Sequence, residues 1–150
     1  MCGIAGIIHR GKVVDIGTEM QGMLQALKHR GPDSTGYALY GEGSQGDYIL
    51  RFKVGENVKE GSSAANEEKS VYDNRRKEVD SYIREMGADI LQDKQLTPYS
   101  FRYIIKYDKD LMEFSKKIES VEMTEILSLG KTLELVKDIG DAGVVSKQYE

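Results

Sequence analysis

Cys2 carries the groups best suited to nucleophilic chemistry. An initiator methionine before a small residue is commonly removed, and loss of Met1 leaves a thiol and a free α-amino group on one residue. Unperturbed pKa values are about 7.7–8.0 for the amine and about 8.5 for the thiol, so near neutral pH the amine can take the thiol proton. Cys2 is therefore a candidate nucleophile with its own base. The alternative is a small apolar residue starting a buried strand, as for most free cysteines.

A second group of candidate residues lies in the segment HRGPDSTGYALY, which begins at His29. Each residue has a structural interpretation when it is taken alone. His29 and Arg30 place positive charge near the end of an expected helix, where it complements the helix dipole. Gly31 can end that helix, and Asp33 and Ser34 are common turn residues. A functional interpretation of these residues needs support from a second motif elsewhere in the chain.

The opening MCGIAGI supplies that second motif. The two motifs together resemble the class II glutamine amidotransferases, N-terminal-nucleophile (Ntn) hydrolases that release ammonia from glutamine, in the family's order and at about its spacing. The resemblance implies that Cys2 attacks the carboxamide of L-glutamine and forms a γ-glutamyl thioester. It also implies that Arg30 and Gly31 belong to the glutamine pocket, and that Asp33 and Ser34 match the turn into the next strand. His29 and Asp33 keep their structural interpretation.

Three parts of the family's glutamine site have no match here. An Asn-Gly pair, which supplies an oxyanion donor, does not occur in the sequence. The His-Thr-Arg motif, whose arginine holds the glutamine carboxylate, is absent because no histidine follows His29. The aspartate that binds the amino group cannot be placed. We therefore expect residues 1–150 to be the N-terminal part of a longer domain, with the oxyanion-hole and carboxylate-binding residues beyond residue 150.

Composition excludes several classes of function. The 150 residues contain 21 Lys and Arg against 25 Asp and Glu, a net charge of −4, whereas nonspecific nucleic-acid binding needs an excess of cations. No run approaches the roughly 18 apolar residues of a membrane span, and no secretory signal opens the chain. One cysteine and two histidines offer little metal-binding capacity. We expect a cytoplasmic protein without metal, cofactor, nucleic-acid or membrane partner.

The hydrophobic pattern predicts an α+β chain. Strand-like runs predict strands over 3–9, 36–40, 47–54, 99–107, 124–129 and 132–137, with clear alternation over 99–107 and a short return strand near 13–16. Residues 36–40 and 47–54 are expected to form a hairpin, and residues 55–66 a linker. Helical spacing predicts helices that begin at a capping box on Thr18, at Asn66 and near Leu111, and a further short helix in the last ten residues.

Residues 67 to about 121 are predicted to form an inserted helix-strand-helix lobe. For the remainder, the resemblance implies the N-terminal part of an αββα Ntn-hydrolase sandwich. About ninety residues separate the second motif from the expected arginine motif. That arrangement is similar to the stand-alone amidotransferase subunits related to glutamate synthase and N-methylglutamate synthase.

The resemblance implies a glutaminase domain that hydrolyses the side-chain amide of glutamine and delivers ammonia to a synthase subunit or domain. The alternative function is a noncatalytic regulatory or scaffold subunit, which keeps the fold but has lost the carboxylate-binding and oxyanion groups. A third hypothesis is an Ntn-type hydrolase that acts on another amide. The ammonia acceptor, the oligomeric state and the role of the lobe cannot be deduced from these residues.

Overall fold

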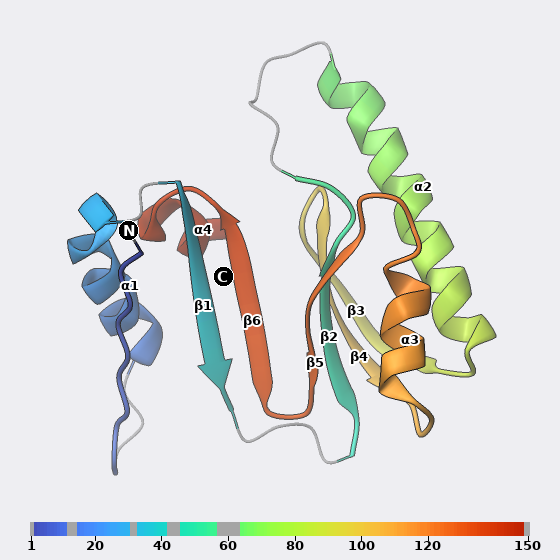
Figure 1. Cartoon of the computed structure of the whole chain (residues 1–150), viewed down its shortest axis with the longest axis horizontal. Coiled ribbons are helices and arrows are strands. Elements are labelled where there is room, and N and C mark those ends of the chain that lie inside the picture. The colour runs from blue at the N-terminus through green and yellow to red at the C-terminus, as the bar shows by residue number, and fades with distance from the viewer. Residues whose placement is uncertain (1, 12–14, 31–32, 42–45, 57–63, 149–150) are drawn as a thin grey trace. The chain divides into compact units, whose positions relative to one another are not determined.

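A computed structural model of the chain describes residues 2–11, 15–30, 33–41, 46–56 and 64–148 (Figure 1). The elements in chain order are α1 (Ile16–Ala26), the 3-10 helix η1 (Lys28–Arg30), β1 (Ser34–Tyr40), β2 (Tyr48–Lys53), α2 (Ala64–Glu85), β3 (Asp89–Thr97), β4 (Ser100–Lys106), α3 (Leu111–Ile118), β5 (Glu125–Gly130), β6 (Leu133–Ile139) and α4 (Ala142–Gln148). The expected α+β class is confirmed. The chain divides into two compact units, of which the first comprises Met1–Tyr37 with Lys137–Glu150 and the second Ala38–Val136.

The second unit is built on a four-stranded antiparallel sheet with the strand order β3-β4-β2-β5. Helices α2 and α3 cover one face of it (Figure 1). Side chains alternate between the two faces of a strand, so Leu50 and Phe52 of β2 lie opposite Tyr103 and Phe101 of β4 on the same face. The ring of Phe52 lies 5.3 Å from that of Phe101 and 5.1 Å from that of Tyr103, between centroids. These aromatic pairs form the centre of the hydrophobic core.

The hydroxyl of Tyr103 is a polar group buried within that core. It donates a hydrogen bond to Asp80 Oδ1 at 2.8 Å and accepts one from Arg76 Nε at 2.9 Å, both from α2. Burial, and then the hydrogen bond to Asp80, raises the pKa of Tyr103, so the hydroxyl stays protonated and can donate. A buried hydroxyl that is fully hydrogen-bonded fixes α2 over the sheet at little cost in solvation.

The opposite face of the four-stranded sheet carries charged side chains. Arg51 of β2 and Arg102 of β4 are register partners and are therefore neighbours on this face. Both donate to Glu134 of β6, Arg51 through Nε at 2.5 Å and Arg102 through Nε at 2.8 Å and Nη2 at 2.9 Å. The carboxylate thus ties the start of β6 to two strands of the sheet.

The first unit holds α1, η1 and α4 beside the first part of β1 and the last part of β6. Strands β1 and β6 pair with each other in a two-stranded sheet. The N-cap of α1 is Asp15, whose Oδ1 accepts from the backbone N–H of Thr18 at 3.0 Å and whose Oδ2 accepts from the Thr18 hydroxyl at 2.6 Å. The helix therefore begins at Ile16, and the predicted capping box on Thr18 is wrong because Asp15 takes that role.

The predicted strand over 3–9 is also wrong. Residues 2–10 have no regular secondary structure, and none of the described residues forms a backbone hydrogen bond with them. The exposure of the side chains nevertheless alternates along residues 2–8. Ile4 and Ile8 are 93% and 88% exposed, whereas Ile7 is half-buried. A strand needs a pairing partner as well as an alternating pattern, and the described part of the chain provides none.

The predicted hairpin of 36–40 with 47–54 is wrong in its pairing, although both strands exist. Strand β1 pairs with β6, and β2 pairs with β4 and β5. The lobe also contains one strand more than predicted, since β3 and β4 both lie between α2 and α3. Strand β3 was missed because its sequence DILQDKQLT is mostly polar, which suits its position at an edge of the sheet.

Several predicted elements are confirmed within a few residues. They are the helix expected from Asn66, the helix near Leu111, the last short helix, and the strands at 99–107, 124–129 and 132–137. Of the expected return strand near 13–16, residues 13 and 14 lie outside the described residues, and the prediction is wrong at Ile16, which begins α1. Most of the expected linker, residues 57–63, also lies outside the described residues. Among the described residues, no helix combines the length and apolar character needed to span a membrane.

Candidate active site

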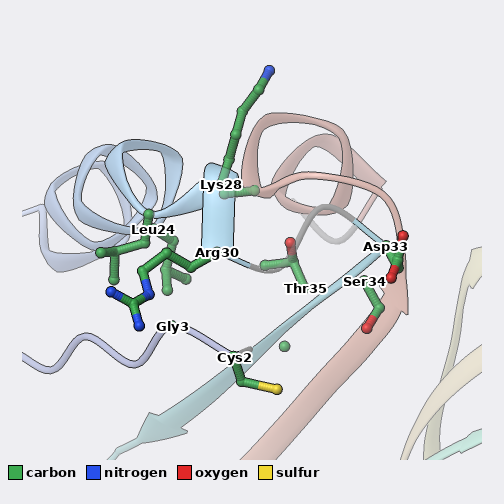
Figure 2. A pocket seen from close by; sticks show the side chains of 11 residues that line it. Cys2, Gly3, Leu24, Lys28, Arg30, Asp33, Ser34 and Thr35 are labelled. Atoms are coloured by element: carbon green, nitrogen blue, oxygen red, sulfur yellow. The ribbon is translucent and has the colours of Figure 1, made fainter.

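A pocket of about 230 Å³ in the first unit contains the candidate nucleophile (Figure 2). Its lining comes from the N-terminal segment, the end of α1, η1, the start of β1 and the first residue of α4: Cys2, Gly3, Leu24, Leu27, Lys28, Arg30, Asp33, Ser34, Thr35, Gly36 and Ala142. Drug-sized ligands occupy pockets of about 300–1,000 Å³, so this pocket suits a smaller molecule. The structure thus brings both sequence motifs to one site.

The N-terminal segment lies against α1, and this places Cys2 in the pocket. A Cβ atom added at Gly3 would lie 3.2 Å from Cβ of Leu27 and 3.5 Å from Cβ of Arg30. The absence of a side chain at Gly3 therefore allows close packing on the end of α1. Farther along the segment, His9 Nε2 lies 2.8 Å from Glu19 Oε2 in the first turn of α1. The side chain of Cys2 is exposed, as a nucleophile requires.

Arg30 is the last residue of η1, and it lines the same pocket as Cys2. Its backbone N–H donates to the carbonyl of Leu27 at 2.8 Å, which holds the turn between α1 and η1. In Figure 2 the guanidinium of Arg30 and the thiol of Cys2 point away from each other. Gly31, the other residue predicted for the glutamine pocket, lies outside the described residues.

The start of β1 and Ala142, the first residue of α4, also line the pocket, and hydrogen bonds join β1 to the Gly140–Ala142 corner. The Gly140 N–H donates to the carbonyl of Asp33 at 3.2 Å, and the Thr35 hydroxyl donates to the carbonyl of Gly140 at 2.8 Å. The Tyr37 hydroxyl donates to the carbonyl of Ala142 at 2.8 Å. Gly140 has φ of +128°, a conformation that favours glycine, so the chain can turn sharply here.

The lining includes charged residues of both signs. Lys28 and Arg30 are cationic, Asp33 is anionic, and Ser34 and Thr35 add hydroxyl groups. A free α-amino acid carries one carboxylate and one ammonium group, which opposite charges in a pocket can bind. No histidine is among the described lining residues.

Sequence analysis did not predict several lining residues, among them Lys28 and Ala142, and it undervalued Asp33. Asp33 was interpreted as a turn residue, yet it lines the pocket as well as accepting the hydrogen bond from Gly140. Lys28 has no distinguishing feature beyond its place before the His-Arg-Gly motif. Ala142 reaches the pocket only through the pairing of β1 with β6, and no local signal in its own segment indicates that.

The chain is similar to a protein of Methanothermobacter thermautotrophicus named "Putative glutamine amidotransferase". The two sequences are 29% identical over 155 aligned residues, which include all of this chain and 47% of that protein. This similarity supports a glutamine amidotransferase family. Because the match covers 47% of that protein, the chain spans about half the length of the curated relative that it matches. No family model and no solved structure matches it.

Proposed function

We propose that this chain is the N-terminal part of a class II glutamine amidotransferase domain and supplies the nucleophile of its glutaminase reaction. The observation that carries the proposal is the exposed thiol of Cys2 in a pocket that also contains Arg30 and Asp33 of the second motif. The similarity to a protein named as a glutamine amidotransferase supports the same activity. By the sequence resemblance, the domain belongs to an αββα Ntn-hydrolase sandwich.

In the proposed reaction, the α-amino group of Cys2 takes the thiol proton and the sulfur attacks the carboxamide carbon of L-glutamine. The carbon–nitrogen bond then breaks, the ammonium group of Cys2 returns the proton to the leaving nitrogen, and ammonia and a γ-glutamyl thioester result. Water, deprotonated by the same amine, hydrolyses the thioester to glutamate and restores the thiol. The ammonia passes to a synthase subunit or domain, which by resemblance is of the glutamate synthase type.

The proposal is tested by labelling the full-length protein with a glutamine analogue that carries an electrophile in place of the carboxamide. We expect one adduct, located on Cys2 by peptide mass spectrometry, and protection from it by excess L-glutamine. Iodoacetamide, which lacks the amino-acid part, is the control reagent. It shows whether Cys2 reacts with a thiol reagent that the glutamine pocket does not recognise. An adduct elsewhere, or no adduct, would favour the alternative function as a noncatalytic regulatory or scaffold subunit.

A free α-amino group at Cys2 should be essential for activity. Retention of Met1, or fusion of any residue before Cys2, converts the amine into an amide that cannot accept a proton. Loss of a general base lowers turnover by about 10²–10⁴-fold, and we expect a decrease in this range. Glutamate release is compared between full-length protein with a proteolytically exposed Cys2 and protein with one residue left before it, with intact mass confirming each N-terminus. Equal rates would show that the amine is not the base.

A further inference from the structure

The geometry points to Asp141 as a positioning residue for this pocket. Asp141 does not line the pocket, but it contacts the side chains and backbone of elements that do. It connects two parts of the first unit. One is α1 with the η1 wall, by which we mean the lining residues Lys28 and Arg30; the other is the corner that begins α4. The inference rests on the proposed function in one respect, namely that the ligand whose binding it affects is L-glutamine.

On one side, Asp141 holds residues of α1 and η1. Its Oδ2 lies 3.4 Å from Nζ of Lys28, the first residue of η1 and a lining residue of the pocket. The side chain of Gln25 of α1 is among the groups that lower the pKa of the Asp141 carboxyl. Lys28 is two residues before Arg30, whose Cβ packs near Gly3, so the position of η1 determines the position of the wall beside Cys2.

On the other side, Asp141 fixes the start of α4. Its Oδ1 accepts from the backbone N–H of Val144 at 3.1 Å, while its carbonyl accepts from the N–H groups of Val144 and Val145. The adjacent residues Gly140 and Ala142 accept the hydrogen bonds from β1 described above. Asp141 is therefore the one described residue that contacts the η1 wall and also lies between the two residues bonded to β1.

The carboxylate of Asp141 is ionised at neutral pH. The hydrogen bond from the Val144 N–H, aided by Gln25 and Lys28, lowers the pKa of Asp141 even though burial opposes the shift. Of the contacts that Asp141 makes with Lys28 and with Val144, only the one with Lys28 requires the negative charge. An asparagine at this position can still accept the Val144 hydrogen bond, but it cannot form an ion pair with Lys28. Asp141→Asn therefore removes the link to η1 and retains the helix cap.

The first experiment measures binding of L-glutamine by calorimetry to full-length Cys2→Ala protein, in which turnover is blocked. Asp141→Asn and Lys28→Met should each weaken binding about threefold to fivefold, as expected for loss of a partly exposed ion pair. Because Asp141→Asn acts through its contact with Lys28, adding it to Lys28→Met should weaken binding no further. Glu122→Gln, which removes the ion pair of Glu122 with Arg75 in the second unit, is the matched control and should not change the affinity.

The second experiment measures amide hydrogen exchange without any ligand. Asp141→Asn should speed exchange about threefold to fivefold in peptides covering residues 24–30, while peptides of α4 keep the parental rate because the cap remains. Unchanged exchange in 24–30 would overturn the inference, and so would unchanged glutamine affinity or fully additive effects of Asp141→Asn and Lys28→Met. If the Cys2→Ala parent does not bind L-glutamine, the proposed function fails, and the exchange rates alone still decide whether Asp141 holds the η1 wall.

Discussion

Cys2→Ala is expected to lower glutamine hydrolysis by the full-length protein by about 10⁴-fold or more. Alanine cannot form the thioester, and removal of a covalent nucleophile leaves only the rate enhancement from binding and electrostatic stabilisation. The side chain of Cys2 is exposed, so its truncation removes little packing and should leave the free energy of unfolding nearly unchanged. The measurement is glutamate release under saturating glutamine, compared with the parental protein.

Two controls separate loss of chemistry from loss of structure. The Cys2→Ala protein should still bind L-glutamine, because the wall that contains Arg30 and Asp33 is intact. It should also unfold at the parental temperature. Release of glutamate at the parental rate by this variant would exclude Cys2 as the nucleophile. An Ntn-type hydrolase that acts on another amide would instead give an unchanged, near-zero glutaminase rate in both proteins.

The sequence was informative about the site where its signal is local. Cys2 and Arg30 were predicted as site residues because each lies in a short motif; both line one pocket, and their roles remain predictions. Lys28 contributes through its ion pair with Asp141, a contact between residues far apart in the chain. Neither Lys28 nor Asp141 has an unusual sequence context. Their proximity results from the packing of α1 against α4, so it could not be predicted from the sequence around either residue.

The same distinction between local and distant information holds for the fold. Helix α3 was predicted well because its apolar spacing and its N-cap Asp110, which accepts from the N–H groups of Met112 and Glu113, are both local. The pairing of β1 was predicted wrongly because its alternating pattern indicates a strand but carries no information about its neighbour. Hairpin pairing is the nearest choice in sequence, and tertiary packing selected β6 instead.

The ion pairs of Glu134 illustrate a feature that no sequence pattern indicated. The side chains of Arg51, Glu134 and Arg102 are 8%, 17% and 24% exposed. Arg51 Nη1 is buried and has no hydrogen-bond partner within the described structure, so Glu134 supplies the only carboxylate that compensates this guanidinium. Removing one partner of a buried ion pair costs more than the pair contributes, because the other charge remains buried without compensation.

Glu134→Gln is therefore expected to lower the free energy of unfolding by about 3 kcal/mol at pH 7, the lower end of the range for a broken buried pair, because Glu134 and Arg102 keep some solvent contact. Glutamine has nearly the shape of glutamate, so the loss reports charge and hydrogen bonding more than packing. Urea denaturation followed by circular dichroism measures the change. The control is Glu122→Gln, since the Glu122 side chain is 84% exposed and its ion pair should contribute less than about 1 kcal/mol.

The difference between the parent and Glu134→Gln should depend on pH in a defined direction. Burial alone would raise the pKa of Glu134, but the hydrogen bonds and charges of Arg102 and Arg51 outweigh it and place the pKa below the ordinary value of 4.5. A carboxyl group whose pKa is lowered by folding stabilises the protein fully above its unfolded pKa, and this contribution is lost as the pH falls through the folded pKa. The two proteins should therefore differ by a constant amount from pH 7 down to about pH 5 and converge as the pH falls further. A difference that persists unchanged to pH 3 would mean that the lost stability comes from packing of the Glu134 side chain, and the ion pairs with Arg51 and Arg102 would then contribute little.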